Sequence, residues 1–197
     1  AGFRQDGGVF EAEDFTIGVS TVEFCAASFW GGSADITDLL LVGGSPATAA
    51  SMFVRGGMVS AARLHIGGDT DATGFVEMNA GSLSVNEIII GAGAGGTGAG
   101  SITVDDGILT GSSAVITRHG TASSIRVLGG TARLDDLDVD GFVGVENALL
   151  DCETLDSSAE GVIHIGPHAD VRADAFVAMG ELEVLDSVVS GDVDPVT

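Results

Sequence analysis

Apolar and polar positions alternate along the chain in short runs, and these runs recur at a nearly constant interval. Counting starts at six glycines separated by 24, 25, 24, 26 and 23 residues: Gly8, Gly32, Gly57, Gly81, Gly107 and Gly130. Positions +2, +4, +7 and +9 after each glycine are almost always apolar or small. In the second repeat these are Ala34, Ile36, Leu39 and Leu41. Each pair predicts a short strand with alternate side chains pointing inward, and the phase change predicts a bend between the two strands.

A third strand precedes each following glycine, with inward residues at −5 and −3, such as Ile102 and Val104 before Gly107. Three short strands in about 24 residues predict an all-β, single-domain, right-handed parallel β-helix (a solenoid) of about eight coils. Residues 1–7 are an N-terminal segment, residues 8–187 form the coils, and residues 188–197 are a C-terminal tail or last partial coil. After a degenerate start at Ala148 the coils shorten, and the register is expected to drift.

The charge balance restricts the partners. The net charge is −22, and all seven basic residues are arginine. Such a chain does not offer the clustered cations that nucleic acids or anionic lipids require, so we expect neither partner. No stretch approaches 18 consecutive apolar residues, which argues against membrane insertion. The apolar fraction of 45% indicates a folded chain despite the charge.

The stretches "GMVSAARLHIGGDTDATGFVEMNAG" (57–81) and "GSLSVNEIIIGAGAGGTGAGSITVDDG" (81–107) resemble the repeats of secreted bacterial β-solenoid proteins. These include autotransporter-passenger-like proteins and related exported surface proteins. The resemblance covers residues 8–147 well and the remainder loosely. It implies an extracellular or cell-surface location and a structural role, because such repeats serve as adhesins, stalks, surface layers and scaffolds.

Two stretches look like ligand-binding loops. Gly93, Gly95 and Gly98 spell G-x-G-x-x-G after a run of isoleucines, but a dinucleotide turn must open a helix, and here another strand follows. We therefore interpret the loop as a glycine-rich corner. Asp69 and Asp71 are weak calcium candidates, because two carboxylates fall short of the six to eight oxygens that calcium prefers. Calcium is the sole cofactor that the sequence brings into consideration.

Catalytic machinery is not expected. Solenoid enzymes of the pectin-lyase type resemble this chain in architecture and use a Lys or Arg base beside carboxylates. Here lysine is absent and Arg133 alone adjoins a carboxylate cluster in a strand. The four histidines (His65, His119, His164 and His168) belong to different coils and faces. Cys25 and Cys152 are interpreted as two buried free thiols, with a disulfide as the alternative.

Assembly is the remaining hypothesis. The +8 positions should face water, yet Leu40, Ile89 and Val115 are apolar there, so they are candidates for an assembly face. The open strand edges at the solenoid ends could also stack head to tail. The sequence thus favours a non-enzymatic extracellular structural protein, a self-associating subunit of a filament, surface layer or stalk. The alternatives are an adhesin that binds glycan or protein on a sheet face, and a polysaccharide-active lyase or hydrolase.

Overall fold

A computed structural model describes residues 2–18, 24–44, 49–68, 71–91, 97–117 and 123–195, with side chains to residue 191. Every regular element within these ranges is a β-strand, and they contain no helix whose length and hydropathy would suit it to crossing a membrane. The strands are β1 (Gly2–Gln5), β2 (Val9–Ala12), β3 (Phe15–Ile17), β4 (Phe24–Phe29), β5 (Ser33–Val42), β6 (Ala49–Ile66), β7 (Thr73–Ile90), β8 (Ala99–Val104), β9 (Ile108–Ile116), β10 (Ser124–Val127), β11 (Thr131–Val139), β12 (Phe142–Val145), β13 (Leu149–Ser157), β14 (Val162–Ile165), β15 (Asp170–Ala178), β16 (Glu181–Val184) and β17 (Val188–Pro195).

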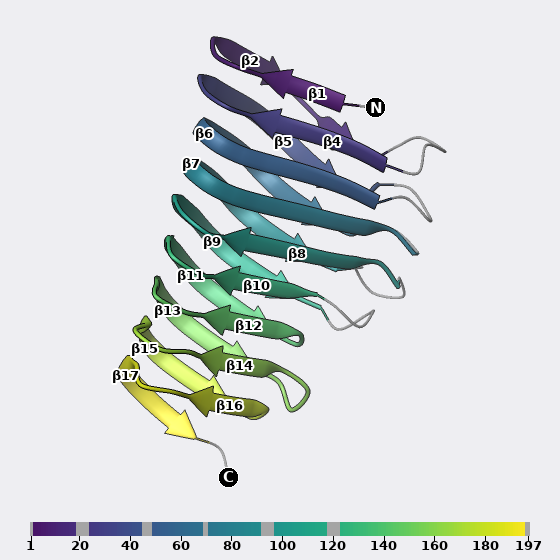
Figure 1. The fold of residues 1–197 in the computed structure, drawn as a ribbon. Helices are drawn as coiled ribbons and strands as arrows, with labels where there is room; N and C mark the ends of the chain where they lie inside the picture. The colour runs from purple at the N-terminus through teal and green to yellow at the C-terminus, as the bar shows by residue number, and fades with distance from the viewer. Residues whose placement is uncertain are drawn as a thin grey trace.

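The strands stack in parallel into two long sheets that face each other across one core (Figure 1). The front sheet contains β1, β4, the first halves of β6 and β7, and then β8, β10, β12, β14 and β16. The back sheet contains β2, β3, β5, the second halves of β6 and β7, and then β9, β11, β13, β15 and β17. In Figure 1 the front strands run leftward and the back strands rightward as the chain descends, so the winding is right-handed.

The predicted fold class, an all-β parallel solenoid, is confirmed, while the number of turns differs slightly from the predicted eight. The strand count per coil also needs correction. In most coils the first two predicted strands are one bent strand, as in β11, where Leu134 and Asp136 pair with β13 on either side of the bend at Asp135. This bend produces the change of phase in the apolar alternation between positions +4 and +7.

One predicted orientation is wrong. Leu40 was expected to point outward, but it is completely buried, whereas Leu39 and Leu41 are half-buried on the outer side. The register between β5 and β6 shifts after Ile36, because β5 carries one more residue at its bend than β6 does. Since side chains alternate along a strand, a single inserted residue reverses every orientation after it.

The core is built from inward columns that continue from coil to coil. One such column contains Phe15, Leu40, Leu64, Ile88, Ala114, Leu137, Leu155 and Phe176. From Leu40 to Phe176 these side chains are at most 1% exposed. Stacking therefore buries what no single coil could bury, as expected for a repeat solenoid. Large aliphatic and aromatic side chains occupy every position of this column except Ala114, which lies between Ile88 and Leu137.

Glycine marks one corner of each early coil because backbone passes directly over backbone there. Gly57 has φ of 74°, and a Cβ added to it would lie 2.5 Å from the carbonyl oxygen of Gly32 in the preceding coil. A residue with a side chain would meet both a strained φ and this close contact. The repeat spacing of the glycines in the sequence is thus a packing requirement.

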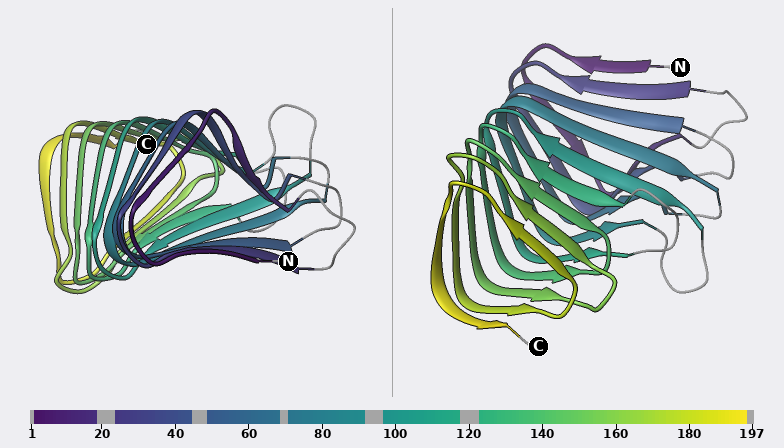
Figure 2. Two further views of the ribbon diagram at one scale, coloured as in Figure 1. Left: turned by 90° about the horizontal axis from the view of Figure 1, so that it is seen from above. Right: turned by 60° about the horizontal axis from the view of Figure 1, so that its bottom comes forward.

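The late coils are shorter at a corner, and their register is largely maintained. Ala132 pairs with Leu150, which pairs with Val171, so the register holds as far as β15, and the expected drift appears only as one shift between β15 and β17, after Ala173. What changes is the connection from back sheet to front sheet, which spans 91–98 between β7 and β8 but only 140–141 between β11 and β12. Figure 2 shows the late coils closing tightly at this corner, whereas the early coils extend beyond it.

Candidate functional site

The candidate assembly face lies on one outward column of the back sheet, and it differs from the predicted one by one residue. Leu41, not Leu40, precedes His65, Ile89 and Val115 in this column. Ile89 and Val115 are paired neighbours, and both are half-buried. The column then becomes acidic, continuing with Asp138 and Asp156 before Val177.

A groove of about 470 Å³ lies where this column changes from apolar to acidic. Its walls include Val115, Val177 and Met179, and its charges come from Asp138 and Asp156, with Asp140 at one end. Partial burial raises the pKa of Asp138, and the neighbouring carboxylates of Asp156, Asp136 and Asp140 raise it further. The groove therefore combines apolar walls with unbalanced negative charge, which suits a small cationic group better than an anion.

Of the two calcium candidates, the structure describes Asp71. Asp69 lies outside the described residues. Asp71 has φ of 59° and exchanges two hydrogen bonds with Thr97: its backbone N–H donates to Thr97 Oγ1 at 3.2 Å, and its Oδ1 accepts from that hydroxyl at 2.9 Å. Asp71 thus ties together the corners of two successive coils. Among the residues that the structure describes, no three His, Cys, Asp or Glu side chains are arranged to hold a metal ion.

The glycine-rich corner is interpreted from its flanks, because residues 92–96, including Gly93 and Gly95, lie outside the described ranges. Gly91 begins the corner with φ of 94°, and a Cβ there would collide with the Ser123 hydroxyl from the next coil. At the far side β8 begins at Ala99 and pairs with β7. The loop is therefore flanked by strands on both sides, and the described residues contain no helix whose N-terminus could hold a pyrophosphate.

The remaining candidates for chemistry are dispersed. Arg133 lines a shallow groove of about 280 Å³ with Asp135 and the hydroxyls of Thr110 and Ser112. His65 Nε2 lies 3.0 Å from the Gly91 carbonyl oxygen, on the back sheet. His164 Nδ1 lies 3.7 Å from Glu183, on the front sheet. His168 belongs to the turn before β15, and His119 is outside the described ranges.

Both cysteines are free and buried, in agreement with the interpretation favoured from the sequence. Cys25 lies in β4 and Cys152 in β13, several coils apart. Burial, followed by the nearby charge of Asp151, raises the pKa of the Cys152 thiol to about 12. At neutral pH this thiol is protonated and unreactive, so it contributes packing instead of chemistry.

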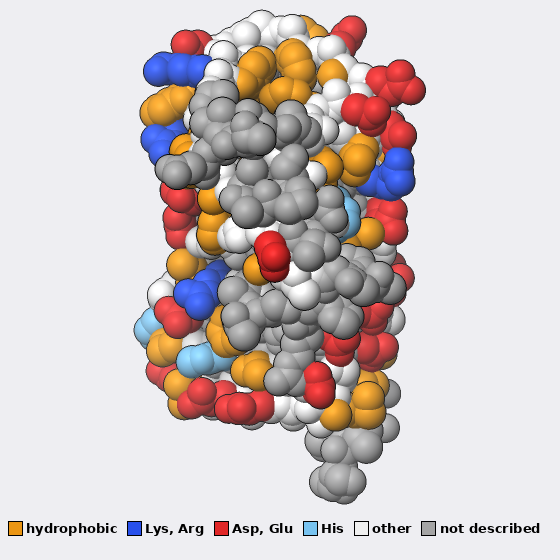
Figure 3. Space-filling view, turned by 90° about the vertical axis from the view of Figure 1, so that its right-hand side faces the viewer, with side chains coloured by type: hydrophobic (Ala, Val, Ile, Leu, Met, Phe, Trp, Pro, Cys, Tyr) orange, Lys and Arg blue, Asp and Glu red, His pale blue; other side chains and the backbone are white. Residues whose placement is uncertain are grey.

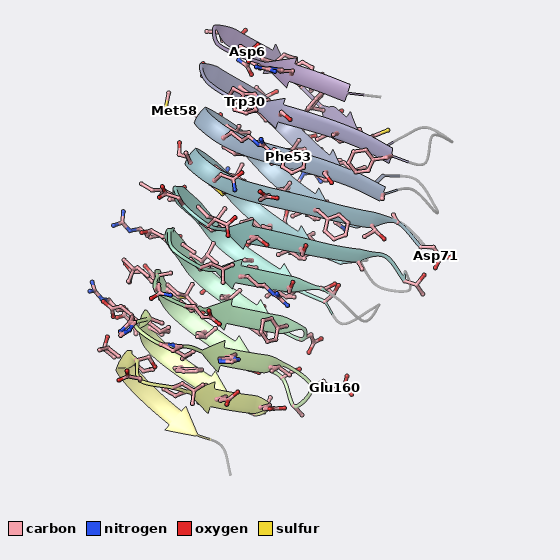
Figure 4. The ribbon with its side chains drawn as sticks, viewed as in Figure 1. Asp6, Trp30, Phe53, Met58, Asp71 and Glu160 are labelled. Carbon is pink, nitrogen blue, oxygen red and sulfur yellow. The ribbon has the colours of Figure 1, made fainter. Side chains whose placement is uncertain are left out.

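The structure adds a feature that the sequence reading missed, a ladder of aromatic rings and guanidinium groups at the edge of the front sheet. Arg4 and Arg55 each lie over the Trp30 ring, at 5.0 and 4.9 Å from its centre, and Arg55 also lies 5.0 Å from the Phe53 ring. Figure 4 shows Trp30 and Phe53 over the strands that face the viewer, with Asp6 beside them. Asp6 accepts a hydrogen bond from Arg4 at 2.7 Å. Arg4 and Phe53 occupy one repeat position, and Asp6, Trp30 and Arg55 another, but the residue type changes from coil to coil, so the hydropathy pattern does not reveal the ladder.

Figure 3 shows the loop edge of the molecule, with acidic side chains along both margins and hydrophobic side chains gathered at the N-terminal end. In comparisons with known proteins, no family model, no curated protein and no solved structure matches the chain. Function must therefore be inferred from the surfaces and the ends of this solenoid itself.

Proposed function

We propose that this protein is a non-enzymatic extracellular structural subunit whose solenoid stacks end to end in a filament, surface layer or stalk. The observation that carries the proposal is that the inward positions of both terminal coils hold apolar side chains that are only partly buried. At the N-terminal end the rings of Phe3, Phe10 and Phe15 meet across the core with centres 5.1 to 5.2 Å apart. All three are only partly buried, since no described strand stacks on the outer side of β1, β2 and β3.

The C-terminal end offers matching positions. Leu182 and Val189 are partly buried against the core, and they belong to the same inward columns as Phe3 and Phe10. Among the described strands, β1 pairs with β4 and β16 pairs with β14, which leaves the outer edge of each terminal strand available. A second copy could therefore continue both the hydrogen-bonding ladder and the core columns in the existing parallel register.

Head-to-tail stacking of this kind does not close, so it produces an open rod. The charge of −22 opposes assembly at low ionic strength, and salt screens this repulsion, so assembly should strengthen with salt. The expected observation is concentration-dependent rods of constant width by negative-stain microscopy, with sedimentation as a second measurement. A monodisperse monomer of native length at high protein concentration in both low and high salt would contradict the proposal.

Two end variants test the polarity of stacking. Phe10→Glu should block the N-terminal end and Val189→Glu the C-terminal end, so neither variant alone should form rods. Mixed together, they should form head-to-tail dimers, because each retains one intact end. Val9→Glu is the matched control, since Val9 adjoins Phe10 but is 72% exposed on the outer surface. Equal loss of assembly in the control would argue against stacking through the core columns.

The non-enzymatic part of the proposal has its own test. Acidic and neutral polysaccharides are incubated with the protein, and new reducing ends or unsaturated products are measured. We expect no turnover. Turnover that disappears on Arg133→Ala would instead support the polysaccharide-active alternative, since Arg133 lies in a groove beside Asp135.

A further inference from the structure

The outward surface of the front sheet carries few charges between β4 and β12, in contrast to the back sheet, whereas the terminal strands β1 and β16 carry Arg4, Glu181 and Glu183. We call two outward columns that run through β4, the first halves of β6 and β7, β8, β10 and β12 the neutral face. Its members are Ala26, Ser28, Ser51, Phe53, Phe75, Glu77, Ser101, Thr103, Ser124, Arg126, Phe142 and Gly144. Glu77 and Arg126 are its charged members, and their charges are opposite, so the net charge of the face is zero.

The outward surface of the back sheet, by contrast, is rich in acidic side chains. Its outward positions carry most of the strand acids, among them Asp35, Glu87, Asp135, Asp136, Asp138, Asp151, Glu153, Asp156 and Asp174. Since a free sheet surface has no structural reason to exclude charge in a chain of −22, the asymmetry marks the front sheet as a surface that becomes covered. Depletion of charge with enrichment of aromatic residues and arginine is the composition of interface centres.

The neutral face is also smooth, because large rings lie beside small residues. Phe75 is paired between Ser51 and Ser101, and Phe142 is paired with Ser124. A Cβ added to Gly144 would lie 2.8 Å from the Phe142 ring, so this ring lies flat across its own strand. Phe75 nevertheless remains 46% exposed. Flat sheet surfaces of this kind pack face to face at about 10 Å.

We infer that the neutral face binds the neutral face of a second copy of this chain, in a two-fold dimer. Six strands spaced about 4.8 Å apart, each about 17 Å long, give roughly 500 Å² per copy and roughly 1,000 Å² per pair, near the lower limit for a specific interface. A second copy fits because two such acidic molecules repel each other least when they approach through surfaces that carry no net charge. This interface is lateral and does not depend on the solenoid ends.

A cysteine placed near the middle of the face tests the two-fold arrangement. Ser101 lies in β8, and the symmetry brings it close to Ser101 of the second copy. Under oxidising conditions Ser101→Cys should form a disulfide-linked dimer, because both native cysteines are buried. Ser112→Cys is the matched control, an exposed serine on the back sheet that should not cross-link. Cross-linking at equal rates in both variants, or in neither, would overturn the inference.

A charge placed on the face provides the second test. Phe75→Asp should convert the dimer to monomer in analytical ultracentrifugation, whereas Met58→Asp, at a 62% exposed methionine outside the neutral face, should not. Circular dichroism and melting temperature show that each variant is folded. Sedimentation of the Phe10→Glu variant separates the two interfaces, since lateral dimers should persist when end stacking is blocked. A wild-type protein that stays monomeric in dilute buffer and in ~1 M salt overturns the inference, and so does a dimer that Phe75→Asp leaves intact.

Discussion

Asp138 and Asp156 lie directly opposite each other on the neighbouring strands β11 and β13, with their side chains in one outward column of the back sheet. Like charges opposite each other in a parallel ladder are unfavourable, and the adjoining groove partly buries Asp138. Both effects raise the pKa of Asp138 above its ordinary value of 3.8, with burial as the larger cause. Relative to the unfolded chain, the folded state therefore favours the protonated form of Asp138.

This relationship predicts how stability depends on pH. A carboxyl whose pKa is raised on folding stabilises the protein fully below its ordinary pKa, and this contribution disappears as pH rises through the raised value. We therefore expect Asp138→Asn to raise the melting temperature at pH 7 by about 1–3 °C. The difference from wild type should shrink as pH falls and vanish below 3.8. Asp174→Asn, an exposed carboxylate on the same sheet, is the control; an equal gain there would indicate general charge reduction instead.

The glycine corner gives a prediction about backbone strain. Gly57→Ala places a methyl group 2.5 Å from the Gly32 carbonyl at a positive φ, so it should destabilise the fold by about 1–3 kcal/mol. For a chain of this length that corresponds to a fall of several degrees in melting temperature. Gly7→Ala is the matched control, because a Cβ at Gly7 meets nothing within 4 Å. Thermal melts followed by circular dichroism compare the two, and equal effects would contradict the proposed contact.

The periodicity of the sequence was sufficient to predict the solenoid because the coils share the inward alternation and the early coils also have a glycine at the corner. In later coils Asn147 and His168 adopt the positive φ at this corner. The periodicity failed at Leu40 because a single extra residue at the bend of β5 reverses the alternation, and both neighbours of Leu40 are leucines. With apolar residues at 39, 40 and 41, hydropathy alone cannot distinguish the two registers. The inward orientation of Leu40 follows from its pairing with Leu64, which is itself buried in the core.

The neutral face could not be predicted for a related reason. Its residues differ in type from coil to coil, so no column of it repeats, and its low charge becomes visible only when the front and back sheets are separated in space. Phe53, Phe75 and Phe142 occur in three different coils, with serine or threonine at the equivalent positions of other coils. In the sequence they look like isolated aromatic residues.

The corrected register can be tested directly at the two adjacent leucines. Leu40→Ala removes a completely buried side chain and should cost about 2–5 kcal/mol in the free energy of unfolding. Leu41→Ala removes a half-buried side chain from the outer surface, so a distinctly smaller loss is expected. Chemical denaturation of both variants measures the difference. A larger loss at Leu41 than at Leu40 would restore the register expected from the sequence.

The ladder at the front edge can be followed through its own chromophore, because Trp30 is the single tryptophan of the chain. Arg55 lies 4.9 Å from the Trp30 ring centre, and its removal exposes that side of the ring to water. Arg55→Ala should therefore shift the tryptophan emission to longer wavelength and lower the free energy of unfolding by about 0.5–1 kcal/mol, as expected for an exposed cation–π contact. Arg172→Ala, which removes an arginine paired with Asp170 far from the ring, should leave the emission unchanged. An emission shift equal in both variants would mean that the spectrum reports general loosening of the fold, and the stacking of Arg55 on Trp30 would then be wrong.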